Sequence, residues 1–137
     1  MPSSGGKYPL LREAGLFVAH ARVSGPKGSR LVRLAVDTGA TSSMIPPKIA
    51  VAIGVHPARA KTIRETVTVS GKEFIPLVLV PRLRVFESTL RRIPVICHAL
   101  PLESPVEGLL GLDLLTRLGA VIDLRTSSIR LRSARHS

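Results

Sequence analysis

One carboxylate among the nine in this 137-residue chain has the surroundings of a chemical group. Asp37 lies in the segment Val36-Asp37-Thr38-Gly39-Ala40-Thr41, directly after the apolar run 31–36, which only Arg33 interrupts. Such a run predicts a buried strand, so the Thr/Gly loop presents a single acid at the end of a strand. We therefore treat Asp37 as the candidate for acid–base chemistry. The other carboxylates are Glu13, Glu65, Glu73, Glu87, Glu103, Glu107, Asp113 and Asp123.

Two other aspartates have simpler structural interpretations. Asp113 falls where a short helix is expected to begin, which favours a role as N-terminal cap. Asp123 lies beside a turn and is expected to face solvent or to stabilise that turn.

The histidines and the single cysteine show no spacing typical of a metal site. Cys97 and His98 are adjacent in an expected strand, so their side chains should point to opposite faces. There is no nucleophile-elbow motif for a serine hydrolase. We expect no metal, and one cysteine excludes an internal disulfide. The histidines are His20, His56, His98 and His136.

The elements that position Asp37 are expected to be short strands. Apolar residues make up 45% of the chain and aromatic residues 3%, so a core of Leu, Val, Ile and Ala is expected. This composition, with eleven prolines, favours a single mainly β domain with one or two short helices. Residues 15–36 predict a hairpin that leads into Asp37, and residues 48–53 predict a short helix closed by Gly54.

A second hairpin is predicted over residues 62–80, with a small tip at Ser70-Gly71 that could act as a lid. Further short strands are expected at 83–86 and 90–98, bounded by Pro81, Glu87-Ser88 and Pro101, followed by a loop over 100–107. A helical stretch at 114–118 and strands at 120–124 and 129–131 complete the domain. We expect a flexible N-terminal arm over 1–12, the domain over 13–132 and a basic C-terminal tail over 133–137.

Lysine and arginine outnumber acidic residues by 20 to 9, which gives a net charge of +11. A charge of this size attracts nucleic acid, anionic membranes or acidic polypeptides without choosing among them. No apolar run approaches the roughly 18 to 20 residues of a membrane span. The first residues lack the basic start and apolar segment of a signal peptide, so a cytoplasmic protein is expected.

Two motifs together resemble the retropepsin-like aspartic proteases, over about residues 15–132. The first is Ala35-Val36-Asp37-Thr38-Gly39-Ala40-Thr41, and the second is Gly108-Leu109-Leu110-Gly111 followed by the stretch 114–119. That family includes retroviral proteases and a domain of ubiquitin-shuttle DNA-damage-inducible proteins. Retroviral members commonly have an acid and an arginine where this chain has Thr41 and Leu112. The chain therefore looks closer to the cellular, bacterial and ubiquitin-shuttle branch.

The resemblance implies a closed-barrel-like fold with one lobe per chain, and an active site formed where two chains meet in a homodimer. Asp37 would face its symmetry mate and Thr38 would hydrogen-bond across the interface. Gly39 would let the backbone approach a substrate. The segment Gly108, Leu109, Leu110 and Gly111 would pack beneath the Asp37 loop, and the substrate would contact Ala40, Val69, Ser70 and Gly71.

The activity that the resemblance implies is aspartic endopeptidase action on a protein or peptide, without a cofactor. Two carboxylates held about 3 Å apart share a proton, because both cannot ionise cheaply. The ionised member can deprotonate a water molecule while the protonated member polarises the scissile carbonyl.

A second hypothesis keeps the fold without hydrolysis: a catalytically silent, basic, dimeric β module that binds acidic polypeptide or nucleic acid. Arg82 with Arg84, and Arg130 with Arg132, would each share a strand face. The aromatic residues do not interleave with these arginines, so stacking on nucleic-acid bases is poorly provided for.

Overall fold

The computed structural model describes residues 6–68 and 70–132, and its secondary structure is mainly β, as expected. The helical segments are α1 (Pro47–Ile53), α2 (Leu112–Arg117) and the 3₁₀ turn η1 (Pro57–Arg59). None of the helices in these residues has the length and apolar character needed to cross a membrane. The strands are β1 (Lys7–Pro9), β2 (Leu11–Glu13), β3 (Leu16–Gly25), β4 (Gly28–Val36), β5 (Met44–Ile45), β6 (Thr62–Thr68), β7 (Gly71–Val85), β8 (Ser88–Cys97), β9 (Gly108–Leu110), β10 (Val121–Asp123) and β11 (Ser128–Arg130).

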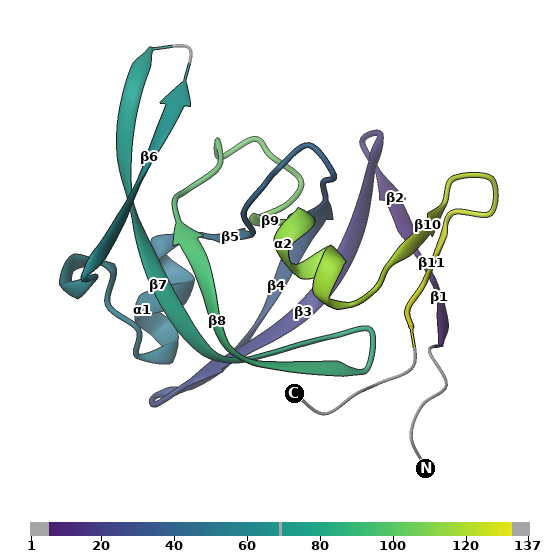
Figure 1. Ribbon diagram of the computed structural model, residues 1–137, viewed down its shortest axis with the longest axis horizontal. Coiled ribbons are helices and arrows are strands. Elements are labelled where there is room, and N and C mark those ends of the chain that lie inside the picture. The colour runs from purple at the N-terminus through teal and green to yellow at the C-terminus, as the bar shows by residue number, and fades with distance from the viewer. Residues whose placement is uncertain (1–5, 69, 133–137) are drawn as a thin grey trace.

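Most strands belong to one eight-stranded sheet in the order β2-β3-β4-β9-β5-β8-β7-β6 (Figure 1). β3 also pairs with β7, so the sheet curls back on itself. A smaller sheet in the order β1-β11-β10 joins the two ends of the described chain. β4, the strand before Asp37, pairs with β3 on one side and with β9 on the other, so Asp37 follows a central strand.

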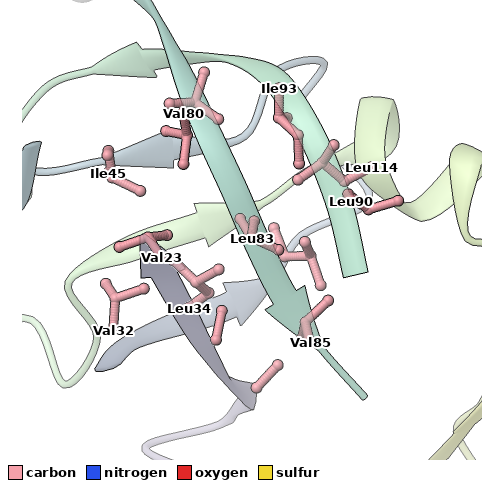
Figure 2. Close-up of a cluster of buried hydrophobic side chains, with 14 of the residues drawn as sticks. Val23, Val32, Leu34, Ile45, Val80, Leu83, Val85, Leu90, Ile93 and Leu114 are labelled. Atoms are coloured by element: carbon pink, nitrogen blue, oxygen red, sulfur yellow. The ribbon is translucent and has the colours of Figure 1, made fainter. Parts of the chain in front are cut away.

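The core lies inside the curled sheet and is built from aliphatic side chains, as the composition predicted. Figure 2 shows Val23 and Leu34 packed with Leu83 and Val85, and Leu114 of α2 reaches the same cluster. Each of these side chains is buried. Packing of this kind fixes the strands that lead into the site, because protein interiors tolerate few voids.

The expectation of a flexible arm over residues 1–12 is wrong for residues 7–12. β1 pairs with β11, β2 pairs with β3, and the Leu10 side chain between them is only 5% exposed. Short Gly- and Pro-rich segments carry a weak strand signal, and here pairing with distant strands decides the conformation. Residues 1–5 and the predicted tail 133–137 lie outside the described residues.

The expected break at Pro81 is also wrong, because β7 continues through it. The ladder with β8 has Val80 opposite Ile93 and Arg82 opposite Arg91, on either side of the proline. The alternation of buried residues shifts by one position there, from the even-numbered Val78 and Val80 to the odd-numbered Leu83 and Val85. Proline interrupts a ladder by removing one donor, and here it marks the place where β7 begins to pair with β3.

The first predicted helix is confirmed as α1. Pro47 occupies its first turn, and Gly54 ends it in the left-handed conformation with φ 91°. Its buried residues Ile49, Ala50 and Ile53 pack against the core. The helix therefore covers the end of the β3–β4 hairpin, where the Lys27 N–H donates to the Ile53 carbonyl at 3.0 Å.

Candidate active site

Asp37 is half-buried immediately after β4, in a loop whose backbone orients its carboxylate. The Gly39 N–H donates to Asp37 Oδ1 at 2.8 Å, and the Ala40 N–H donates to the Asp37 carbonyl at 3.2 Å. Thr38 and Gly39 are exposed at the tip of this loop, and Ala40 is half-buried behind it. The loop therefore fixes the carboxylate close to the surface, beside exposed backbone.

The segment from Gly108 to Leu112 supports this loop from both ends. β9 runs parallel to β4, with Val36 opposite Leu110. The Asp37 N–H donates to the Leu110 carbonyl at 3.0 Å, and the Leu112 N–H donates to the Ala40 carbonyl at 2.8 Å. The two motifs found in the sequence are thus brought together in one hydrogen-bonded unit.

The glycines of the second motif permit this close approach. A Cβ atom on Gly108 would lie 2.1 Å from the Met44 carbonyl oxygen. A Cβ atom on Gly111 would lie 2.8 Å from the Ala40 carbonyl oxygen. A larger residue at Gly108 would push β9 away from β5, and one at Gly111 would push the chain away from the Asp37 loop, because both neighbouring atoms are backbone.

A network that the sequence did not reveal joins Ser43 to Asp113. The Ser43 hydroxyl donates to Asp113 Oδ1 at 2.7 Å and accepts the Gly111 N–H at 2.9 Å. The Ser43 N–H also donates to the Asp113 carboxylate at 3.0 Å. The expectation that Asp113 caps α2 is wrong, since Gly111 occupies the cap position and Asp113 lies in the first turn. Its carboxylate instead ties α2 to the strand that leaves the Asp37 loop.

The β6–β7 hairpin projects from the body on the same side as the Asp37 loop (Figure 1). Arg64 of β6 donates from Nη1 to the hydroxyl of Ser42, and Glu73 Oε2 lies 3.9 Å from His98 Nε2. Ser70 and Gly71 are exposed at its far end, while Val69 lies outside the described residues. Arg64 thus contacts the body near the base of the hairpin, and Glu73 contacts it nearer the tip.

The loop over residues 98–107 covers the face of β3 and β4 that leads to Asp37. Val106 packs there with Val18 and Ala35, and Leu100 and Leu109 lie against them. A cavity of about 370 Å³ lies between this loop and the start of α1, and Asp37 does not line it. Its lining residues are Pro46, Pro47, Lys48, Ala99, Leu100, Pro101, Leu102, Ser104, Val106 and Glu107.

Other chemical groups lie apart from this site. The described residues contain no group of three His, Cys, Asp or Glu side chains arranged to bind a metal ion. Cys97 and His98 point to opposite faces, as predicted, since Cys97 is buried and His98 is exposed. Burial raises the pKa of the Cys97 thiol to about 11, which suppresses its reactivity.

Asp123 behaves as the turn residue that the sequence predicted. Its Oδ1 accepts the N–H groups of Thr126 at 3.2 Å and Arg125 at 2.9 Å. These hydrogen bonds lower the pKa of Asp123, and the bond from the Thr126 backbone has the largest effect.

Comparison with known proteins agrees with this geometry. The family model described as "Aspartyl protease" matches residues 19–114, which include both the Asp37 loop and the Gly108–Gly111 segment. The chain belongs to the aspartyl protease family. The predicted resemblance to retropepsin-like proteases is thereby confirmed.

A solved structure shares the fold of this family member. It is the crystal structure of a retropepsin-like aspartic protease from Rickettsia conorii, which aligns with a TM-score of 0.73 at 23% sequence identity. The alignment covers 98% of this chain and 97% of that chain. No curated protein sequence matches the chain significantly.

Proposed function

We propose that this chain is a retropepsin-like aspartic endopeptidase in which Asp37 is the catalytic residue. The observation that supports this most directly is the clamped loop after β4. Gly39 orients the Asp37 carboxylate, the Leu110 carbonyl of β9 accepts the Asp37 N–H, and the Leu112 N–H of α2 donates to the Ala40 carbonyl. A carboxylate fixed at a strand end beside exposed backbone is suited to act on a bound peptide.

The proposed active unit is a homodimer with one barrel-like lobe from each chain. A single chain supplies one loop with one acid, whereas this reaction uses two carboxylates. The exposed tip at Thr38 and Gly39 is available to meet a second copy on a two-fold axis. In that arrangement Thr38 hydrogen-bonds across the interface and braces the two loops.

The proposed reaction is direct attack of water on the scissile carbonyl carbon. One Asp37 carboxylate removes a proton from the water while the protonated Asp37 of the second copy donates a hydrogen bond to the carbonyl oxygen. The tetrahedral intermediate collapses as the C–N bond breaks and the leaving nitrogen takes up a proton. Because one proton is shared by the pair, activity should have a bell-shaped dependence on pH in the acidic range.

The substrate is proposed to bind in an extended conformation between the β6–β7 hairpin and the Asp37 loop. Backbone groups of Gly39 and Ala40 on one side, and of Ser70 and Gly71 on the other, can add main-chain hydrogen bonds to it. Val69 is proposed to contribute at the hairpin tip, and Gly108–Gly111 to support the loop below. The bonded base of the hairpin, Arg64 with Ser42, would act as its hinge.

The test is the substitution Asp37→Asn, assayed with a library of internally quenched peptides across pH 3 to 8. We expect peptidase activity to fall by at least about 10³-fold, because asparagine cannot remove the proton from water. The fold should persist, since an amide oxygen can still accept the Gly39 N–H. Asp123→Asn is the matched control, and it should retain the parent activity and pH profile.

An Asp37→Asn protein that cleaves peptides as fast as the parent would show that the assignment is wrong. A parent protein that folds, binds acidic polypeptide and cleaves no peptide at any pH would instead support the silent β module. Thermal unfolding of each variant shows whether a loss of activity arises from loss of the fold.

A further inference from the structure

Four arginines lie side by side on the neighbouring strands β3, β7 and β8, outside the Asp37 loop. The β-sheet register places Arg22 of β3 directly opposite Arg84 of β7. On the other side of β7, Arg82 is opposite Arg91 of β8. We call Arg22, Arg82, Arg84 and Arg91 the arginine cluster.

All four side chains point away from the core. Alternate residues of a strand face opposite sides of the sheet, and Val23, Leu83 and Val85 are buried in the core (Figure 2). Arg22, Arg82 and Arg84 are therefore on the outer face, and each member of the arginine cluster is exposed. Directly opposite residues have Cβ atoms about 5 Å apart, so the guanidinium groups can act on one ligand together.

No carboxylate of residues 6–68 or 70–132 forms an ion pair with the arginine cluster. Arg22 Nη1 donates to the Ser29 hydroxyl at 3.0 Å, and Arg84 Nη1 donates to the Thr89 hydroxyl at 3.1 Å. The ion pairs of the described chain are Arg33–Glu13, Lys72–Glu65 and His98–Glu73. Like charges directly opposite in a sheet are destabilising, so the cluster favours an anionic ligand.

We propose that the arginine cluster binds an acidic segment of polypeptide in extended conformation. Arg82 and Arg84 are two residues apart on one strand, about 6.7 Å, which is also the spacing of alternate side chains in an extended peptide. Carboxylates at alternate positions can therefore pair with both arginines at once. The planar guanidinium fork suits carboxylates, with which it forms paired hydrogen bonds.

An acidic polypeptide fits this surface better than a nucleic acid does. Single-stranded nucleic acid is usually bound by basic grooves in which aromatic rings stack on the bases. Here Tyr8 packs against Phe86, Arg12 lies over the Phe17 ring, and Phe74 is on the β6–β7 hairpin. None of these aromatic residues is the cross-strand partner of a member of the arginine cluster.

The cluster shares a sheet face with the approach to Asp37. Along the β3–β4 pair, Arg22 is opposite Leu31, His20 is opposite Arg33, and Val18 is opposite Ala35. Asp37 follows six residues after Leu31, a distance of about 20 Å along an extended strand. Because the loop over residues 98–107 covers this face at Val18 and Ala35, a polypeptide that reaches Asp37 from the cluster passes around that loop and needs more than about six extended residues. A role in recruiting substrates with acidic segments rests on the proposed peptidase function, whereas the binding itself does not.

Binding is tested by fluorescence anisotropy in the Asp37→Asn background, where no cleavage can occur. The probe is a fluorescein-labelled 12-residue peptide of alternating Glu and Ser, in 50 mM NaCl. We expect Arg82→Gln with Arg84→Gln to raise Kd about tenfold, since each exposed ion pair contributes roughly three- to fivefold. The matched control, Arg59→Gln with Arg125→Gln, removes the same charge elsewhere and should change Kd less than about threefold.

A peptide of the same composition with the repeat Glu-Glu-Ser-Ser has no two Glu residues at positions i and i+2, so it tests the spacing and should bind several-fold more weakly. Equal losses in the cluster and control variants would overturn the proposal, because net charge alone would then explain binding. It would also be overturned if the cluster variant weakened binding of a 12-nucleotide oligothymidylate but left peptide binding unchanged. Urea unfolding checks the fold, and Arg84→Glu should raise the midpoint because it replaces a repulsion with Arg22 by an attraction.

Recruitment is tested separately with the protein that retains Asp37. The cluster variant should raise KM about tenfold for a substrate with an alternating acidic tail and leave kcat unchanged. A substrate without that tail should be cleaved as by the parent. Absence of all cleavage would contradict the proposed function, while the anisotropy result would still decide the binding proposal.

Discussion

At the scale of single residues, Asp37 and Asp123 show that local turn geometry does not by itself identify a catalytic acid. Both carboxylates accept a backbone N–H from two residues further along the chain. Asp123 accepts its hydrogen bonds from its own turn, and this hydrogen bonding is the largest cause of its lowered pKa. Asp37 is additionally fixed by a strand more than seventy residues away in sequence. Long-range support distinguishes the candidate site from an ordinary turn.

The buried Cys97 thiol should react slowly with alkylating reagents in the folded protein. Burial raises its pKa from 9.0 to about 11, so at pH 8 its thiolate fraction should be about 100-fold lower than in the unfolded chain. Iodoacetamide should therefore modify the folded protein at least about 100-fold more slowly than the protein in urea. From pH 8 to 9 the folded rate should rise about tenfold and the unfolded rate about fivefold. Similar rates in both states would mean that β8 opens readily.

The same shift has a consequence for stability. A thiol whose folded pKa is raised stabilises the fold fully below pH 9, and the contribution is lost as pH rises toward 11. This thiol should therefore make the protein less stable in alkaline solution. Below pH 9 it should have no effect on the pH dependence of unfolding.

At the scale of elements, the site depends on how α2, β9 and the Asp37 loop are joined. Ser43 occupies the centre of this junction, because its hydroxyl bonds both Asp113 of α2 and the Gly111 N–H after β9. The loop is thus fastened at Asp37, at Ala40 and at Ser43. The helix, the strand and the loop should consequently move as one unit.

Replacing Ser43 tests this junction. Ser43→Ala leaves the Gly111 N–H and part of the Asp113 carboxylate without a partner, which should lower the free energy of unfolding by about 1–3 kcal/mol. Ser88→Ala is the control, because Ser88 has no side-chain hydrogen bond in the described part of the chain, and it should cost less than about 0.5 kcal/mol. Urea unfolding measures both. Equal stability of the two variants would show that the junction does not depend on the Ser43 hydroxyl.

At the scale of the whole molecule, the chain presents half of the proposed site. The two ends of its described part meet in the β1-β11-β10 sheet, and the eight-stranded sheet curls around the main core. Within this lobe, Thr38 and Gly39 remain exposed. A lobe that supplies one carboxylate to the proposed site is the geometry expected of a dimeric aspartic protease.

Subunit mixing tests the homodimer. If both copies of Asp37 are needed, random pairing with an equal amount of Asp37→Asn protein should reduce activity per parent chain to about half. A ninefold excess of the variant should reduce it to about one tenth. Activity per parent chain that is independent of the variant would show that each chain acts alone. Sedimentation over the same concentrations checks that dimers form.

Much of the fold and site was predictable because the signals are local. The apolar run before Asp37, the Pro46-Pro47 start of α1 and the glycine at its end each depend on neighbouring residues. The strands at 7–12 were missed because Lys7 to Pro9 form a strand only by pairing with β11. Ser43 and Asp113 were missed because seventy residues separate two groups whose types are ordinary for a turn and a helix start.

The sequence by itself determined the family-like pair of motifs, the mainly β composition and the choice of Asp37, because residue type and near-neighbour spacing specify these. Only the tertiary structure decided what surrounds Asp37: the hydrogen bonds from β9, the close approach at Gly108 and Gly111, and the Ser43–Asp113 link. It also placed Arg22 opposite Arg84. These contacts join residues far apart in the chain, and they exist only once the sheet has curled and the core has packed.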